Sequence, residues 1–445
     1  MYPWIVKNLI YFPIQAIRGE KVARYMDEIR AFHAVSLVRK QEMQWSKLTA
    51  LLDFVYSNNR YYRELFDKHG VDVRNIHNPE DFRKIPFLTK ESIRAESNEM
   101  VSDHSGRVSV RKTSGSTGIP LVFVKDRDST AYMDALMYEV YGWHGIAIGD
   151  RQSRVWGIPL DFKNRTFTKL KDFLLNRKRL VSFDITEESC KEHFLTLKRF
   201  KPAFMYGLVN TIVEFAKLSA RVGLDPAELR LKVVVTTGEI LFPRSRQLLQ
   251  EAFQCPIVNE YGTTENGVVA FECRSGEMHL LMHNIYVEII NPENGSPVAP
   301  GEMGEVILTE LHSYAMPFIR YRVGDIIRLS SRTCACGLEL PLVDEVIGRE
   351  SDLIVTPDGR RISSAILSYS MTDDVLKFRS YQRAIDRLDV FIQKTDNFKE
   401  DDLSLIEKKI RTYLGEEISI TMNMVKDLEP ERSGKFRHFV SELKK

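Results

Sequence analysis

The sequence contains few cysteines, no excess of charge of either sign and no long apolar run. Five cysteines in 445 residues are few and odd in number, which argues against a disulfide framework and leads us to expect a cytoplasmic protein. Lysine and arginine total 63 against 61 acidic residues, so the charge gives no support for a nucleic-acid-binding surface. No uninterrupted apolar stretch reaches the roughly 18 residues of a transmembrane helix.

The sequence also lacks repeats, low-complexity tracts and a recognisable secretory signal. It begins MYPWIVKNLIYFPIQAIRGEK, which has aromatic and basic residues but no clean apolar core and no small-residue cleavage site. We expect this segment to form a helix that packs on the protein body. A helix that lies on a membrane surface is the alternative.

The composition and the patterning indicate a globular α/β protein with more than one domain. Apolar residues make up 43% and charged residues 28% of the chain, as in ordinary globular proteins. Residues 20–100 show long periodic stretches of charged and apolar residues, which predict helices. From about residue 108, short β-branched runs alternate with helical patterns, and 280–330 reads almost entirely as strands. This alternation is typical of an α/β core.

A domain boundary is expected at GRESD, residues 348–352. We assign 1–348 to an N-terminal domain, of which 1–105 is largely helical, and 349–445 to a small α+β domain. In the small domain the sequence predicts a hairpin, two strands and a helix, at 352–363, 387–393, 417–425 and 403–415. A unit of this size can bury a core of its own, so it can move as a body.

The strongest local signal is a glycine- and hydroxyl-rich stretch, TSGSTGIP, at 113–120. Glycines let backbone N–H groups approach an anion, and hydroxyls add donors. The stretch lies between VSVRK and LVFV, which predicts a turn between two strands. It lacks the lysine of a Walker loop, and a polar surface turn is the alternative.

Six motifs together resemble the signatures of the adenylate-forming superfamily, in the same order. They are TSGSTGIP (113–120), TTGE (236–239), NEYGTTE (259–265), YRVGD (321–325), IGRESD (347–352) and RSGKFR (432–437). The chain most resembles the phenylacetate-CoA ligase branch, whose relatives include capsule-biosynthesis proteins. The resemblance implies a large α/β adenylate-forming domain with a β-rich subdomain, followed by a mobile α+β lid.

The resemblance implies a set of nucleotide-binding residues. A phosphate loop would comprise Thr113, Ser114, Gly115, Ser116, Thr117 and Gly118. Tyr261 would stack on adenine, Thr264 would bond the α-phosphate, and Glu265 would hold Mg²⁺, for which a carboxylate is a suitable ligand. The same set includes Gly238, Glu239, Glu260, Gly262 and Thr263.

Four further residues receive roles from the resemblance. Asp325 would accept hydrogen bonds from the ribose hydroxyls, and Arg349 would contact ribose or phosphate. Asp352 matches the hinge about which the small domain rotates. Lys435 resembles the mobile lysine that bridges the carboxylate and the α-phosphate during adenylation. Each of these residues could instead be an ordinary surface charge.

Two clusters of soft ligands suggest a structural zinc site. Cys273 and His279 form one cluster, and Cys334 and Cys336 form the other. Three thiolates and one imidazole suit tetrahedral Zn²⁺. His283 and His312 are rival ligands, and free buried cysteines or a redox pair are the alternatives.

The implied reaction uses ATP and Mg²⁺ to convert a carboxylic acid into an acyl-adenylate, which then reacts with CoA. The alternative is transfer to an amine or hydroxyl acceptor in capsule or surface-polysaccharide biosynthesis, and a non-catalytic binding module is a third reading. Candidate pocket residues are Trp156, Tyr206 and Gly207, with Trp143 and His144 as further candidates. The sequence indicates neither the acid nor the oligomeric state.

Overall fold

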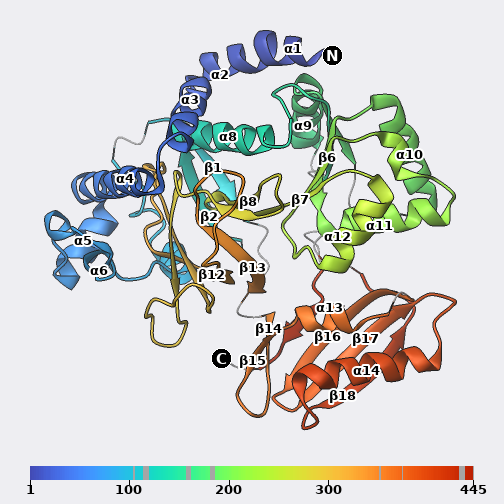
Figure 1. Cartoon of the computed structure of the whole chain (residues 1–445). Helices are drawn as coiled ribbons and strands as arrows, with labels where there is room; N and C mark the ends of the chain where they lie inside the picture. The colour runs from blue at the N-terminus through green and yellow to red at the C-terminus, as the bar shows by residue number, and fades with distance from the viewer. Residues whose placement is uncertain are drawn as a thin grey trace.

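The computed structural model has a large unit built on one sheet and a smaller C-terminal unit (Figure 1). The residues that it describes are 1–103, 106–113, 120–156, 162–180, 186–349, 352–372, 374–429 and 436–443. The rainbow colouring shows the N-terminal helices and the C-terminal unit at opposite ends of the molecule.

The N-terminal part is helical, as the sequence predicted. Its helices are α1 (Pro3–Ile5), η1 (Val6–Tyr11), α2 (Phe12–Arg18), α3 (Val22–His33), α4 (Leu37–Asn58), α5 (Arg60–His69), η2 (Val73–Asn75), α6 (Pro79–Phe82) and α7 (Lys90–Ala95). Short polar side chains cap several of them: Ser36, Asn59 and Thr89 each accept a hydrogen bond from a first-turn amide of α4, α5 and α7. Tyr11 is buried against Tyr138 of helix α8 (Arg127–Gly142), so this segment packs on the body as expected.

The main sheet has eleven strands among the described residues, in the order β10-β11-β12-β13-β9-β8-β7-β6-β5-β3-β4. Strands β4, β3, β5, β6 and β7 are parallel, and β7 begins the antiparallel part. The parallel strands are β3 (Gln152–Val155), β4 (Arg177–Leu180), β5 (Phe204–Leu208), β6 (Val233–Thr237) and β7 (Ile257–Thr263). The others are β8 (Gly267–Glu272), β9 (Met278–Leu280), β10 (Ile285–Ile290), β11 (Met303–Glu310), β12 (Tyr321–Leu329) and β13 (Leu342–Arg349).

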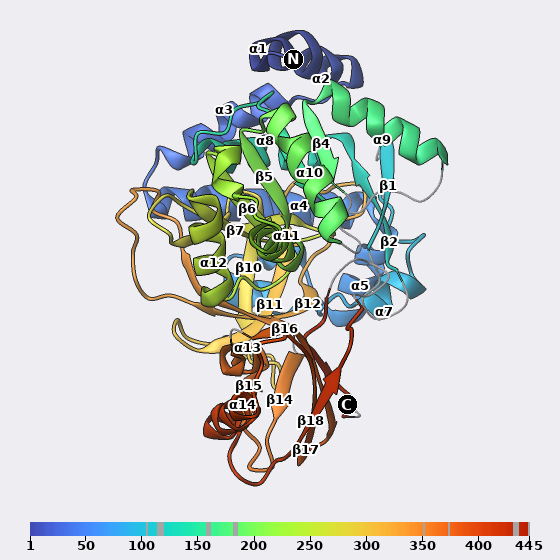
Figure 2. The ribbon, with the colours of Figure 1, turned by 90° about the vertical axis from the view of Figure 1, so that its right-hand side faces the viewer.

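Helices cover both faces of the parallel part of the sheet (Figures 1 and 2). One face packs on α8 (Arg127–Gly142) and the other on α10 (Glu187–Phe200), α11 (Val209–Arg221) and α12 (Pro243–Phe253). Helix α9 (Phe162–Leu174) and the short η3 (Pro226–Leu229) complete the helices of this part. In such sheets ligands bind beyond the carboxyl ends of the parallel strands, so this edge is the place to look for a site.

The C-terminal unit is a four-stranded sheet, ordered β18-β17-β16-β19, with helices on it. Its elements are β14 (Leu353–Val355), β15 (Arg361–Ser363), α13 (Ala365–Ser370), β16 (Val375–Ala384), β17 (Arg387–Lys394), α14 (Glu400–Leu414), β18 (Ser419–Val425) and β19 (Phe439–Ser441). The β14–β15 hairpin, β17, β18 and α14 fall where the sequence predicted them. The unit has its own buried core, between Ile354 and Phe439. The boundary at 348/349 itself stays a prediction.

Among the described residues, no helix combines the length and apolarity needed to cross a bilayer.

Candidate active site and cysteine–histidine cluster

The stretch that begins at Thr113 connects two antiparallel strands, β1 (Val108–Lys112) and β2 (Val122–Asp126). The two predicted strands are therefore confirmed, and they form an antiparallel pair. Thr113 closes the turn: its amide donates to the Leu121 carbonyl (3.0 Å), and its Oγ1 accepts from the Leu121 amide (2.9 Å). Ser114, Gly115, Ser116, Thr117 and Gly118 lie outside the described residues.

The far end of β2 is fixed to the main sheet by buried charges. Asp126 accepts the backbone amides of Tyr314 and Ala315 at 2.8 and 2.9 Å. Lys125 forms a buried ion pair with Glu310 at the end of β11. Because the β1–β2 hairpin is anchored in this way, the turn at Thr113 has a defined attachment to the body.

The turn between β7 and β8 holds Glu265 in a buried position. Glu265 is 7% exposed, and its Oε1 accepts a hydrogen bond from the Tyr321 hydroxyl at 2.9 Å. Thr263 Oγ1 accepts the Asn266 amide at 2.9 Å, which shapes the turn, and Thr264 is exposed. A Cβ at Gly262 would lie 2.6 Å from the Gly267 carbonyl oxygen, so the close approach of β7 and β8 requires glycine there.

Tyr261, Asp325 and Arg349 lie together, although they are far apart in sequence. The Tyr261 hydroxyl donates to Asp325 Oδ2 at 2.9 Å. The β12–β13 register places Asp325 opposite Arg349, and Arg349 Nε lies 3.8 Å from Asp325 Oδ1. Burial, followed by the Asp325 carboxylate, raises the pKa of Tyr261 well above its usual range, so Tyr261 stays a donor. The adenine-stacking role of Tyr261 stays a prediction.

The TTGE turn after β6 touches both the large unit and the C-terminal unit. Gly238 adopts a positive φ of 75°. Glu239 Oε2 accepts the Asn210 amide at 2.8 Å, and its Oε1 accepts the Phe436 amide at 3.2 Å. Lys435 lies outside the described residues, but its neighbour Phe436 is hydrogen-bonded to this turn.

The expected hinge residue Asp352 contacts both sides of the connection. Its Oδ2 accepts the Arg349 amide at 3.1 Å, and its Oδ1 lies 3.8 Å from Arg437 Nη2. Burial raises the pKa of the Asp352 carboxyl. Gly348, with φ of 118°, has a backbone conformation that other residues rarely adopt. The connection between the units therefore combines a glycine with a carboxylate that pairs across it.

Trp156 and Tyr206 lie side by side at the carboxyl ends of β3 and β5. Their rings are 5.9 Å apart and nearly parallel, with an interplanar angle of 19°. Gly207 is required by strand packing, because its Cβ would lie 2.6 Å from the Val155 carbonyl oxygen. Trp143 and His144 lie elsewhere: Trp143 packs against His279, 6.2 Å between ring centres, so their assignment to the acid pocket was wrong.

The sequence analysis missed Arg154 of β3, whose side chain lies beside both aromatic rings. Its guanidinium lies 5.1 Å from the Tyr206 ring centre and 5.5 Å from that of Trp156. Within the described part of the chain no ion pair joins Arg154 to an acidic residue, and its buried Nε has no hydrogen-bond partner. Nearby Glu260 is buried and accepts from the Tyr206 hydroxyl at 3.0 Å. The signal was an arginine in an otherwise apolar strand run, SRVWG.

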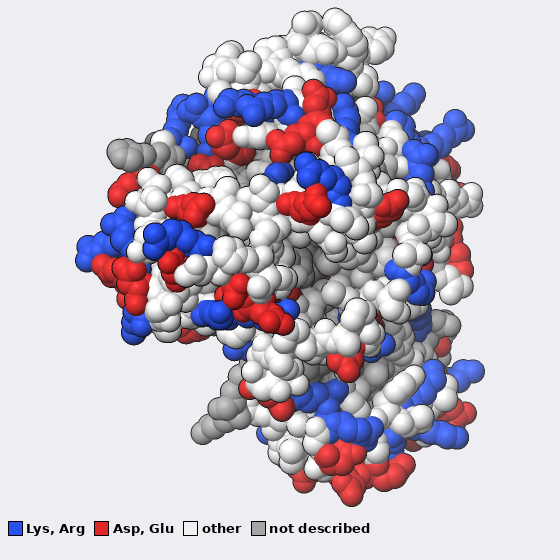
Figure 3. Space-filling view, turned by 60° about the vertical axis from the view of Figure 1, so that its left-hand side comes forward, with Lys and Arg blue, Asp and Glu red and all other residues white. Residues whose placement is uncertain are grey.

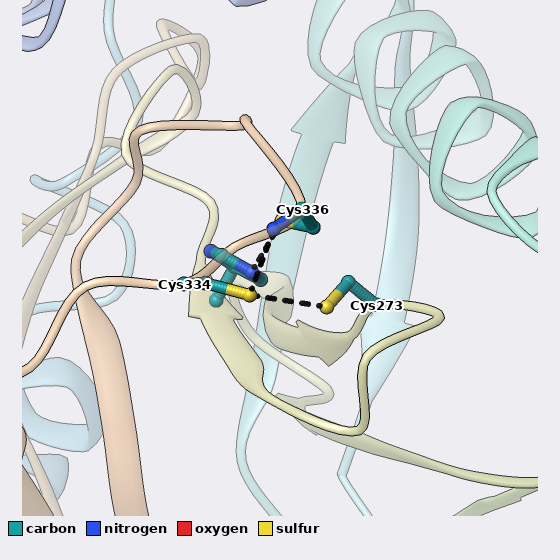
Figure 4. Close-up of side chains that lie close together, drawn as sticks. Cys273, Cys334 and Cys336 are labelled. Carbon is teal, nitrogen blue, oxygen red and sulfur yellow. Dashed lines mark hydrogen bonds between the residues drawn. The ribbon is translucent and has the colours of Figure 1, made fainter.

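The four proposed zinc ligands come together in the structure (Figure 4). Cys273 follows β8, His279 lies in β9, and Cys334 and Cys336 lie in the β12–β13 connection. Because β9 pairs with both β8 and β13, the sheet joins segments that lie about sixty residues apart. The ligand atoms all lie within 4.8 Å of one another.

The distances in the cluster fit a tetrahedral ion. Cys273 Sγ lies 3.7 Å from Cys334 Sγ, and Cys336 Sγ lies 3.3 Å from His279 Nε2. Metal–sulfur bonds of about 2.3 Å at tetrahedral angles separate two sulfurs by about 3.8 Å. The rival ligands are engaged elsewhere: His312 stacks on Tyr132, 3.5 Å between ring centres, and His283 packs against Phe32.

Two family models match the chain. The family described as AMP-binding enzyme matches residues 98–312, and the CapK C-terminal domain matches 354–442. Protein CapK of Staphylococcus aureus is 20% identical over 418 residues, covering 91% of this chain and 89% of that protein. Phenylacetate-coenzyme A ligase of Thermus thermophilus is 25% identical over 326 residues, covering 70% of this chain and 71% of the enzyme.

The fold matches a solved structure over nearly the whole chain. This structure is 2-hydroxyisobutyryl-CoA ligase in the postadenylation state, at 18% identity and a TM-score of 0.77, covering 92% of this chain and 90% of that one. Against the same enzyme in the thioesterification state, the TM-score is 0.63.

Proposed function

Since the chain belongs to the adenylate-forming enzymes, in the branch that holds phenylacetate-CoA ligases and CapK, we propose that it activates a carboxylic acid with ATP and transfers the acyl group to CoA. A carboxylate oxygen attacks the α-phosphorus and pyrophosphate leaves. The CoA thiol, losing its proton, then attacks the acyl carbonyl and AMP leaves. The observation that carries the proposal is the convergence of Tyr261, Glu265, Asp325 and Arg349 at the rim of the sheet.

Each residue of this rim has chemistry suited to a nucleotide. Asp325 accepts two donors at once, as the ribose hydroxyls require, and Tyr261 and Arg349 hold it in place. Thr113 and the hydroxyls after it would donate to phosphate oxygens. Thr264 is exposed at the turn and would donate to the α-phosphate. These assignments rest on the family motifs and on the contacts described above.

Glu265 is the residue proposed to hold Mg²⁺. One of its oxygens already accepts from Tyr321, which keeps the carboxylate oriented, and a carboxylate is a fitting ligand for this cation. Bound Mg²⁺ supplies positive charge to the phosphates as pyrophosphate leaves.

Lys435 is proposed to stabilise the adenylation transition state from the C-terminal unit. Its neighbour Phe436 bonds Glu239, and the higher TM-score to a postadenylation state supports an arrangement suited to the first half-reaction. A lysine is a compact charge on a flexible stem and can bridge the two sets of oxygens that approach each other. Rotation about Asp352 would withdraw it and admit the thiol.

The four-ligand cluster is proposed to hold a structural Zn²⁺. Three thiolates and one imidazole leave no open position for substrate, which is the arrangement of a structural site. The ion would tie β8, β9 and the β12–β13 connection together.

We propose further that the acid carries a second anionic or strongly polar group. Arg154 lies beside the rings of Trp156 and Tyr206, and its buried Nε has no hydrogen-bond partner among the described residues. Burial raises the pKa of the Glu260 carboxyl, and the charge of Arg154 opposes that rise. A buried guanidinium N–H group without an acceptor is costly unless a ligand accepts from it. The two aromatic rings would cover the apolar part of the same acid.

An acceptor other than CoA is the second candidate, and one observation favours it. The CapK relative covers 91% of this chain, and the C-terminal unit matches the CapK C-terminal domain. Transfer to an amine or hydroxyl acceptor in capsule or surface-polysaccharide biosynthesis would use the same adenylate. We place either reaction in the cytoplasm, where ATP and CoA are available.

A pyrophosphate-release assay over paired acids tests these proposals. Each pair consists of a monocarboxylate and an analogue that carries a second carboxylate or hydroxyl. Each acid is tested with CoA, with amines and without an acceptor. Acid-dependent release and a thioester formed only with CoA are expected, with a preference for the second polar group that Arg154→Met removes. Product only with an amine or glycan acceptor would favour the second candidate. No release with any acid in protein that binds ATP would contradict the proposed activity.

A further inference from the structure

Two helical segments far apart in sequence form one surface at the end of the molecule opposite the C-terminal unit. They are the N-terminal helices α1, η1 and α2, and helix α9 with the strand that follows it, residues 162–180 (Figures 1 and 2). The Met1 amino group donates to Asn176 Oδ1 at 3.1 Å, and Asn176 Nδ2 returns a bond to the Met1 carbonyl at 2.9 Å. We call residues 1–19 and 162–180 together the aromatic–basic surface.

This surface exposes Trp and Phe side chains, which the rest of the described chain keeps at least half buried. Trp4, Phe167 and Phe173 are 65%, 67% and 66% exposed. They are the only Trp or Phe side chains in the described part of the chain that are more than half exposed, out of 4 Trp and 24 Phe in the sequence. Tyr2, Leu9, Ile17 and Leu170 are also more than half exposed. White atoms of the N-terminal helices dominate the top of Figure 3.

The opposite face of the N-terminal helices packs on the protein body, so these helices are exposed on one face only. Tyr11 packs edge-on against Tyr138 of α8, 5.3 Å between ring centres. Gln15 Nε2 donates to Asp134 Oδ2 of α8 at 3.3 Å. The helices are therefore held on the body, with one face turned to it and the other to solvent. A helix with this division fits the boundary between water and lipid.

The charge of the surface is strongly one-sided. Residues 1–19 contain Lys7 and Arg18 and no acidic residue, and 162–180 contain seven basic residues and one acidic residue. The whole chain has a net charge of only +2, so the remainder is net acidic. Two of the basic residues are paired: Arg179 with Asp172 at 2.9 Å, and Arg18 at 2.7 Å with Glu20, which lies just outside the surface. Exposed aromatic side chains beside a net positive charge suit an anionic lipid surface.

We propose that the protein docks on an anionic lipid bilayer through the aromatic–basic surface. Trp4, Phe167 and Phe173 enter the headgroup region, and the lysines beside them, such as Lys7 and Lys169, contact lipid phosphates. A second copy of the chain fits less well, because a symmetric contact would bring the two sets of basic residues together. Nucleic acid fits less well, because the exposed rings are interspersed with aliphatic Leu9, Ile17 and Leu170, which suit lipid chains and not base stacking. The C-terminal unit, at the far end, stays free to rotate.

Vesicle flotation tests the proposal. The full chain is mixed with vesicles of phosphatidylcholine alone or of phosphatidylcholine with phosphatidylglycerol, at low and high salt. Binding is expected only with phosphatidylglycerol and is expected to weaken as salt rises, since exposed charges are screened. Replacing Trp4, Phe167 and Phe173 by Ser should lower binding about tenfold. The matched control, Leu405→Ser with Tyr413→Ser on exposed positions of α14, should bind as wild type.

Two further measurements keep the proposal falsifiable if the triple variant folds poorly. Lys7→Glu with Lys169→Glu should abolish the preference for phosphatidylglycerol, and both variants should keep acid-dependent pyrophosphate release. The fluorescence of Trp4, whose side chain is the exposed tryptophan, should shift to the blue on vesicle addition, and Trp4→Phe should remove the shift.

Other outcomes would overturn the proposal. These are no binding to either vesicle, equal binding by all variants, a concentration-dependent dimer that the same substitutions abolish without any vesicle binding, or tighter binding to a labelled oligonucleotide than to vesicles. If the wild-type protein releases no pyrophosphate, that result contradicts the proposed activity and not the proposed lipid binding.

Discussion

The two sides of the nucleotide site are built differently. On the large unit, Asp325 and Glu265 are each held by the hydroxyl of a buried tyrosine, Tyr261 and Tyr321, within one continuous sheet. On the C-terminal side, Phe436 bonds Glu239 and Arg437 approaches Asp352. The side on the large unit is part of the core of the main sheet. The side on the C-terminal unit is a docked surface, the surface through which that unit contacts the large unit.

The docked surface combines polar contacts with the packing of Phe242 against the rings of Tyr369 and His438. Lys377 of β16 pairs with Glu214 of α11 at 3.1 Å, and Arg244 Nη1 donates to the Met371 carbonyl at 3.0 Å. His438 Nε2 lies 3.3 Å from Asn210 Oδ1, and burial lowers the pKa of His438 to about 4, so it is neutral at pH 7. Because contacts of this kind exchange readily with water, a lysine delivered by this unit can be withdrawn between two chemical steps.

The largest expected effect comes from a substitution on the large unit, the side of the nucleotide site that belongs to the core. Asp325→Ala removes the proposed ribose acceptor and leaves the Tyr261 hydroxyl without its partner, so we expect adenylation and acyl transfer to fall by about 10- to 100-fold each. Both half-reactions depend on the ribose contact, because the adenylate retains it. Pyrophosphate release and consumption of a preformed adenylate measure the two. Asp344→Ala, an exposed carboxylate on β13, is the control, and an Asp325 variant that keeps its KM for ATP would contradict the role.

A smaller effect, on stability, is expected from removing ligands of the cysteine–histidine cluster in the large unit. Purified protein should contain zinc, and Cys334→Ser with Cys336→Ser should lower the Tm by about 5–10 °C, because loss of a structural ion frees the β12–β13 connection. Metal analysis and thermal unfolding measure this. Cys255→Ser, outside the cluster, should leave both unchanged. If the wild-type protein contains no zinc, or if the variants keep the wild-type Tm, the cluster is a group of free thiols and not a structural metal site.

The smallest effect is expected at the docked surface. Glu214→Lys replaces the ion pair with Lys377 by a repulsion between half-exposed groups, which should slow adenylation by about two- to fivefold. Acyl transfer from a preformed adenylate should not slow, because it needs the C-terminal unit to leave this position. Glu251→Lys on α12 serves as the control. Equal slowing of both steps would show that the two units act as one body.

Local patterns predicted much of the fold and the site. The strands VSVRK and LVFV, the hairpin at 352–363 and the helix at 403–415 each carry periodicity or turn residues of their own, and the structure has them. The sequence suggested Cys273, His279, Cys334 and Cys336 as zinc ligands, with His283 and His312 as rivals, and the sheet brings the first four together.

What the sequence did not reveal depends on register and on distant partners. The hydrogen bond from Tyr321 to Glu265 joins the start of β12 to the β7–β8 turn, and no local pattern specifies that contact. Trp143 was misplaced because a helix end does not show which neighbour it meets; it packs near His279. Arg154 could be recognised only in the structure, which shows that its buried Nε has no hydrogen-bond partner among the described residues. The aromatic–basic surface joins two segments about 145 residues apart, which only the fold brings side by side.

The most direct test of the account separates the two half-reactions in Lys435→Ala. Acid-dependent pyrophosphate release should fall by at least about 100-fold, since one preorganised charge at the transition state is lost. Transfer of the acyl group from a supplied adenylate should stay close to the wild-type rate, and Lys426→Ala should leave both rates unchanged. An equal loss of both half-reactions, or no loss of either, would contradict a lysine that the C-terminal unit delivers for adenylation alone.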